Sequence, residues 1–137
     1  MSFQQVIKHL NNDWTSPELL EILNDLTYEN GDTNTADALR MLVDDVFTIQ
    51  NGDRGNIPNK VLLITDGVSN VKPENTIIQA RRVHDLGVAI HVIGVQLNDD
   101  SEVNMIANEN QVYLIDNYKR LPAMLEDMTE IICNDHI

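Results

Sequence analysis

The residue best placed to do chemistry is Asp66, which stands directly after a run of four apolar residues. Residues 61–64 read VLLI, and Thr65, Asp66 and Gly67 follow at once. A short apolar run bounded by such residues indicates a buried strand. In open parallel sheets, ligands bind beyond the carboxyl ends of the strands. We therefore predict that the Asp66 carboxylate lies at a ligand-binding edge.

A second oxygen donor at the same edge is predicted at Thr33. Residues 31–35 read GDTNT and form a turn that leads into a helical apolar pattern. A hydroxyl and a carboxylate that meet at a sheet edge suit a hard cation such as Mg²⁺. Threonine is also a common cap at the start of a helix, so the spacing alone leaves both interpretations of Thr33 open.

The elements that must position these two residues alternate between strand and helix. Nearly continuous apolar strands are predicted at residues 61–65, 88–95 and 112–115, and a weak strand candidate at residues 4–10. Helical patterns run over residues 15–26, 33–49, 73–86 and 99–107, and from residue 120 onward. We predict an α/β fold, a Rossmann-like open and mainly parallel sheet with helices on both faces, formed by a single domain over residues 1–137.

The composition excludes several classes of function. The net charge of −13 repels phosphate backbones, which argues against nucleic-acid binding and favours cations and basic partners. No apolar run approaches the length of a membrane span, about 18 residues, and residues 1–10 lack the apolar segment of a secretory signal. The four histidines lack metal-ligand spacing, and no nucleotide-binding or serine-hydrolase motif is present.

The order of several motifs resembles one family. GDTNTADAL is followed by VLLITDG, LGVAIHVIGV and VYLID, and the opening HLNNDWTSPELLEIL resembles the segment that joins the family's third strand to its next helix. Together these motifs closely resemble the von Willebrand factor A domain, in particular the extracellular-matrix type of matrilins and non-fibrillar collagens. The resemblance covers nearly the whole chain. It implies a secreted, non-enzymatic protein-binding or adhesion module of the extracellular matrix.

The resemblance also implies a metal-ion-dependent adhesion site at the top of the sheet. In the family this site binds Mg²⁺ or Mn²⁺, and a carboxylate of the protein ligand, for example a matrix protein such as a collagen, completes the coordination. Thr33 matches the threonine of the family's G-x-T-x-T turn, and Asp66 matches its T-D-G aspartate. The family's D-x-S-x-S motif is absent, since residues 13–17 and 99–103 each fail at the last position. We expect a remnant site with weak or no cation binding.

A further implication of the resemblance is an N-terminally incomplete domain, or fragment. The family's first strand, first helix and second strand have no counterpart in residues 1–137. In the family's strand order 3-2-1-4-5-6, the first strand pairs with the strand that residues 61–65 resemble. We therefore expect a free edge there, marginal stability and self-association through that edge. Matrix-type domains often bridge a cysteine before the first strand to one after the last helix, which implies a disulfide partner for Cys133 outside this chain.

Two alternatives to a matrix adhesion module remain open. An intracellular A-domain scaffold subunit is compatible with the single cysteine, Cys133. A Mg²⁺-dependent phosphohydrolase-like α/β domain also ends a strand in an aspartate, and Asp116 would then be the second acid beside Asp66. Turnover of a generic phosphate ester that is abolished by Asp66→Asn would identify the enzyme.

Overall fold

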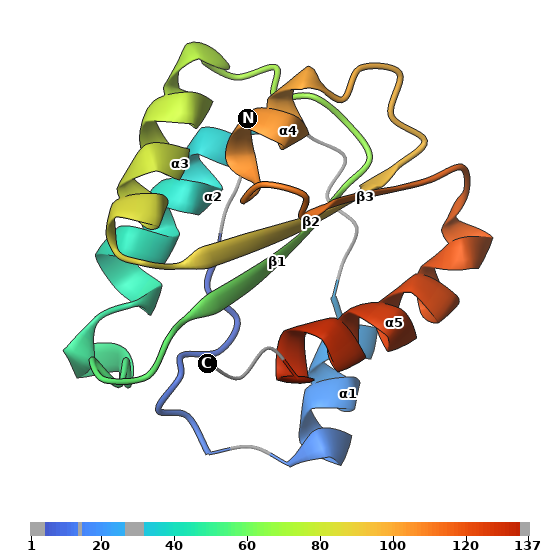
Figure 1. The fold of residues 1–137 in the computed structure, drawn as a ribbon. Coiled ribbons are helices and arrows are strands. Elements are labelled where there is room, and N and C mark those ends of the chain that lie inside the picture. The colour runs from blue at the N-terminus through green and yellow to red at the C-terminus, as the bar shows by residue number, and fades with distance from the viewer. Residues whose placement is uncertain (1–4, 14, 27–31, 135–137) are drawn as a thin grey trace.

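The computed structural model describes residues 5–13, 15–26 and 32–134 and shows a parallel three-stranded sheet between two layers of helices (Figure 1). The strands are β1 Lys60–Thr65, β2 Ala89–Val95 and β3 Val112–Ile115, in the order β1-β2-β3. Thr65 lies opposite Gly94, and Val95 lies opposite Ile115, so the three carboxyl ends meet at one edge of the sheet. The predicted α/β fold with a parallel sheet is confirmed.

The helices agree with the sequence patterns in type, and one of them changes form along its length. The bounds are α1 Ser16–Asn24, α2 Thr35–Met41, α3 Glu74–Asp85, α4 Ser101–Ile106 and α5 Leu121–Asn134. A π-helical turn, η1 Leu42–Val46, continues α2, and the 3₁₀ turns η2 Ile49–Asn51 and η3 Tyr118–Arg120 complete the described helices. Each described helix is too short or too polar to cross a membrane.

The core lies on both faces of β2, as expected for a strand covered by helices on each side. Ile90 and Val92 point to the face covered by α2, α3 and α4, whereas Ile93 and Val95 point to the face covered by α5 (Figure 1). All four side chains are fully buried. Burial of a side chain of this size stabilises the fold by about 1.5–3 kcal/mol, so β2 is the structural centre of the domain.

At one side of the sheet, β1 is an edge strand in the described part of the chain. It pairs with β2 alone, and its Ile64 side chain is 43% exposed. The expected free edge is thus present. The strand candidate at residues 4–10 is wrong for residues 5–10, which adopt no strand. A strand exists through pairing, and no described segment pairs with residues 5–10.

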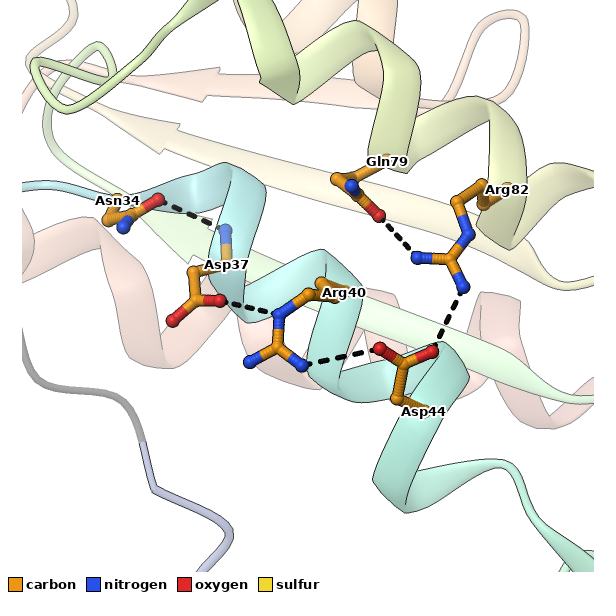
Figure 2. A network of polar contacts seen from close by, with 6 residues as sticks. All are labelled: Asn34, Asp37, Arg40, Asp44, Gln79 and Arg82. Carbon is orange, nitrogen blue, oxygen red and sulfur yellow. Dashed lines mark hydrogen bonds and ion pairs between the residues drawn. The ribbon is translucent and has the colours of Figure 1, made fainter.

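A polar network joins α2 and η1 to α3 (Figure 2). Asp44 lies between two arginines: its Oδ1 accepts from Arg82 Nη2 at 2.9 Å and its Oδ2 from Arg40 Nη1 at 3.2 Å. Arg40 Nε also donates to Asp37 Oδ1 at 2.7 Å, and Arg82 Nη1 donates to Gln79 Oε1 at 2.8 Å. The hydrogen bond from Arg82, followed by that from Arg40, lowers the pKa of the Asp44 carboxyl below its usual 3.8. The network therefore ties the π-helical turn to α3 while Asp44 is ionised.

Replacement of Asp44 by asparagine is expected to lower the urea midpoint slightly at pH 7. Because the pKa is lower in the folded state, the stabilisation is complete above the usual value of 3.8 and disappears as the pH falls through the lower, folded pKa. The difference between wild type and Asp44→Asn should therefore vanish in strong acid. Asp127→Asn, an exposed site on α5, is the control. An equal difference at pH 7 and in strong acid would contradict the assigned role.

Candidate functional site at the carboxyl edge of the sheet

Asp66 lies where the sequence predicts, directly after the last residue of β1, and it is exposed. Thr65 shapes the turn, because its Oγ1 donates to the Gly67 carbonyl oxygen at 3.0 Å and accepts from the Gly67 amide at 3.3 Å. The Tyr118 hydroxyl donates to Asp66 Oδ2 at 2.6 Å. Tyr118 belongs to η3, after the far strand β3, so this hydrogen bond spans the whole edge.

Thr33 lies beside the same turn. Its Oγ1 would stand 3.9 Å from a Cβ atom placed on Gly67, the residue next to Asp66. The residue that caps α2 is Asn34, whose side chain accepts from the Asp37 amide at 3.0 Å. The interpretation of Thr33 as a helix cap is therefore wrong. The structure brings the two predicted residues, Thr33 and Asp66, to one edge.

The backbone of Thr33 is held by the loop that follows Asp66. The Thr33 amide donates to Asn70 Oδ1 at 2.9 Å, and the Thr33 carbonyl accepts from the amides of Asn70 at 3.0 Å and Val71 at 3.3 Å. Sequence reasoning missed Asn70, because its role depends on a contact across 37 residues. It also missed Tyr118, although Tyr118 follows a predicted strand end at the same edge.

The side chains at this edge do not form a complete cation shell. Thr33 and Asp66 offer oxygen atoms of the right chemistry, but Mg²⁺ requires near-octahedral coordination. One of the two Asp66 carboxylate oxygens already accepts from Tyr118. Over the described residues, no group of three or more histidines, cysteines or acids is placed to hold a metal. Among the described residues, those at this edge thus do not fit tight binding of a resident cation, and weak or absent cation binding stays a prediction.

The two remaining candidate residues make no described contact with Thr33 or Asp66. The Asp116 carboxylate pairs with Arg120 Nε at 3.6 Å and accepts from Asn117 Nδ2 at 3.3 Å, so its described contacts do not join it to Asp66. Cys133 is an exposed free thiol near the end of α5. Its disulfide partner outside this chain stays a prediction.

An open depression continues the edge beyond β2 and β3. Its volume is about 530 Å³, and it combines exposed leucine with polar and acidic side chains. The lining residues are Gln96, Leu97, Asn98, Leu114, Ile115 and Asp116. The edge therefore combines an exposed carboxylate with a depression of mixed polar and apolar lining.

Comparisons with known sequences identify the family. The sequence model of the von Willebrand factor type A domain matches residues 2–127. The collagen alpha-1(XII) chain of Notophthalmus viridescens is 28% identical over 128 residues, which are 91% of this chain and 14% of that protein. Matrilin-3 of Gallus gallus is 29% identical over 107 residues, 74% of this chain and 23% of that protein. The chain therefore spans only a small part of the length of these relatives.

Solved structures show the same fold. The proximal thread matrix protein 1 from the mussel byssus superposes with a TM-score of 0.83 at 23% identity, over 92% of this chain and 33% of that one. A further structure of the mussel protein, described as having a zinc-occupied MIDAS motif, gives a TM-score of 0.81 at 23% identity with the same coverage. At this level of identity the likeness shows the fold alone. By its sequence match and its fold, the chain belongs to the von Willebrand factor type A domain family.

Proposed function

We propose that the chain is a non-enzymatic protein-binding module of an extracellular-matrix or cell-adhesion protein, and that its partner docks on the carboxyl edge of the sheet. The observation that carries the proposal is the meeting of the Thr33 hydroxyl with the turn that presents the exposed Asp66 carboxylate. The depression beside β3 extends the contact surface. The relatives, a collagen chain and a matrilin, support a matrix partner and an extracellular location.

The proposed partner is a matrix protein such as a collagen. In the contact that the resemblance implies, an acidic residue of the partner completes the coordination of Mg²⁺ or Mn²⁺. Thr33 and Asp66 are too few to hold such an ion tightly, so we propose weak cation binding and direct recognition of the partner by Asp66. A carboxylate forms its strongest hydrogen bonds with charged donors such as arginine, which suits a chain of net charge −13.

Surface plasmon resonance on immobilised collagen tests this function. The wild-type chain is expected to bind reversibly, and removal of divalent cations with EDTA is expected to weaken binding less than the loss of the Asp66 charge. Absence of binding to collagen and to other matrix proteins on the same chip would overturn the proposed function. Sub-micromolar Mg²⁺ binding in titration calorimetry would overturn the weak-cation part alone.

We also propose that the free edge of β1 supports self-association. An edge strand presents unpaired backbone groups to another chain, and a lysine on the edge is a known means of preventing such pairing. Ile64→Lys, at a side chain that is 43% exposed, is therefore expected to shift the chain toward monomer in sedimentation velocity at high concentration. Ile78→Lys, at a residue of α3 that is itself 57% exposed, is the matched control. Equal association of wild type and Ile64→Lys would exclude the β1 edge.

A further inference from the structure

A buried carboxylate lies beneath the loop that follows Asp66. Glu102, in the first turn of α4, is only 8% exposed, and both of its oxygens accept hydrogen bonds from one residue, Ser69. The Ser69 amide donates to Oε2 at 2.7 Å, and the Ser69 hydroxyl donates to Oε1. Among the described residues, Glu102 makes no ion pair. A buried charge is costly unless it is hydrogen-bonded, so this carboxylate depends on Ser69 for its stability.

A third buried residue fixes the direction of these hydrogen bonds. Thr76, on α3 and fully buried, donates its hydroxyl proton to Ser69 Oγ at 3.2 Å. Because Ser69 Oγ accepts from Thr76, its own proton is directed to Glu102. Hydrogen bonds to an ionised acceptor are about twice as strong as neutral ones. The loop is therefore anchored to α3 and α4 at Ser69.

Ser69 directly precedes Asn70, the residue that forms hydrogen bonds with the Thr33 backbone. Asn70 accepts from the Thr33 amide through its side chain and donates its own amide to the Thr33 carbonyl. Hydrogen bonds join Glu102 to Ser69 and Asn70 to Thr33, and the peptide bond between Ser69 and Asn70 completes a path from Glu102 to Thr33. On the other side of Ser69, three residues toward the N-terminus, the same loop carries Asp66.

We propose that Glu102 is a positioning residue, which fixes the loop of residues 66–71 and thereby holds the Thr33 hydroxyl beside the Asp66 turn. This inference rests on the proposed function, because it concerns the same edge. Glu102 does not touch the partner and acts only through Ser69 and Asn70. Loss of its charge leaves the core packing intact and loosens the edge.

Amide hydrogen exchange measured by NMR tests this role residue by residue. The amides of Ser69, Asn70 and Thr33 each donate one of the hydrogen bonds on the path. In Glu102→Gln, which keeps the side-chain volume but not the charge, they are expected to exchange about ten- to a hundredfold faster than in the wild type. Equal rates at these three amides in both proteins would overturn the inference.

The control separates positioning from a general loss of stability. Val103→Ala removes two buried methyl groups from the same helix, α4, and is expected to destabilise the fold without changing local exchange at the three amides. Equal acceleration in Val103→Ala and Glu102→Gln would overturn the positioning role. Should Glu102→Gln fail to fold, Ser69→Ala tests the positioning role instead. This variant removes the hydroxyl hydrogen bond to Glu102 and keeps the amide one, and it is expected to accelerate exchange at the Asn70 and Thr33 amides.

Binding to collagen, measured in parallel, distinguishes the two proposals. Glu102→Gln is expected to bind several-fold more weakly than wild type, while Val103→Ala retains its affinity at a temperature where it is folded. A wild-type chain that does not bind would overturn the proposed function, yet the exchange rates would still decide the role of Glu102. If Glu102→Gln binds collagen as tightly as the wild-type chain does, the positioning role alone is overturned.

Discussion

Ile93→Ala is expected to lower the free energy of unfolding by about 2–5 kcal/mol. Ile93 is fully buried on the central strand β2, in the cluster that includes Val95, Ile115 and Met128. The substitution loses the transfer free energy of three carbon atoms and leaves a cavity between the sheet and α5. Domains are stable by only about 5–15 kcal/mol, and among the described residues β1 pairs with β2 alone, so a large fraction of the variant should be unfolded at 37 °C.

Urea unfolding followed by circular dichroism measures this effect. The matched control is Ile78→Ala on α3, where the isoleucine side chain is 57% exposed and the expected change lies within about 0.5 kcal/mol. A loss of less than about 1 kcal/mol in Ile93→Ala would contradict the placement of the core at the interface of β2 and α5.

The sheet could be predicted from the sequence because its strands carry their own signal. Residues 61–65, 88–95 and 112–115 are nearly continuous apolar runs, and the structure has strands at 60–65, 89–95 and 112–115. A parallel strand with helices on both faces must be apolar throughout, so local composition was sufficient. Residues 5–10 carry a weaker pattern, and strand formation there requires a pairing partner that local composition does not encode.

The helix predicted over residues 33–49 shows a second limit. Its apolar stripe continues through Leu42, Val43 and Val46, but the structure changes from α-helix to π-helix at Leu42. Asp44, within the π-helical turn, bonds Arg82 across 38 residues. The π-helical turn thus occurs together with a long-range contact. Apolar periodicity in the sequence predicts neither the contact nor the change of helix type.

The candidate site likewise contains residues that the sequence predicts and residues that it does not. Asp66 was predictable because it ends a buried strand, and Thr33 because it precedes a helix at a turn. Tyr118 contacts Asp66 across 52 residues, and Ser69 contacts Glu102 across 33 residues. These partners come together only when the strands are in register, and no motif in the sequence predicts their contacts.

The second large effect concerns Asp66 and its proposed partner. Asp66→Asn keeps the shape of the side chain and an oxygen that can accept from Tyr118, but it removes the charge. Hydrogen bonds to charged groups contribute about 1.5–3 kcal/mol, so affinity for the partner should fall by about tenfold or more. Asp85→Asn removes the same charge from the exposed end of α3 that leads into β2, at the opposite end of the sheet. This control should change affinity by less than about twofold.

The central claim, that the carboxyl edge is the protein-binding surface, is tested most directly by the affinity of these two variants for immobilised collagen. Surface plasmon resonance of wild type, Asp66→Asn and Asp85→Asn at one salt concentration gives the comparison. The predicted result is an affinity at least about tenfold weaker for Asp66→Asn and nearly unchanged for Asp85→Asn. Equal affinities for wild type and Asp66→Asn, or equal losses in the two variants, would contradict the claim.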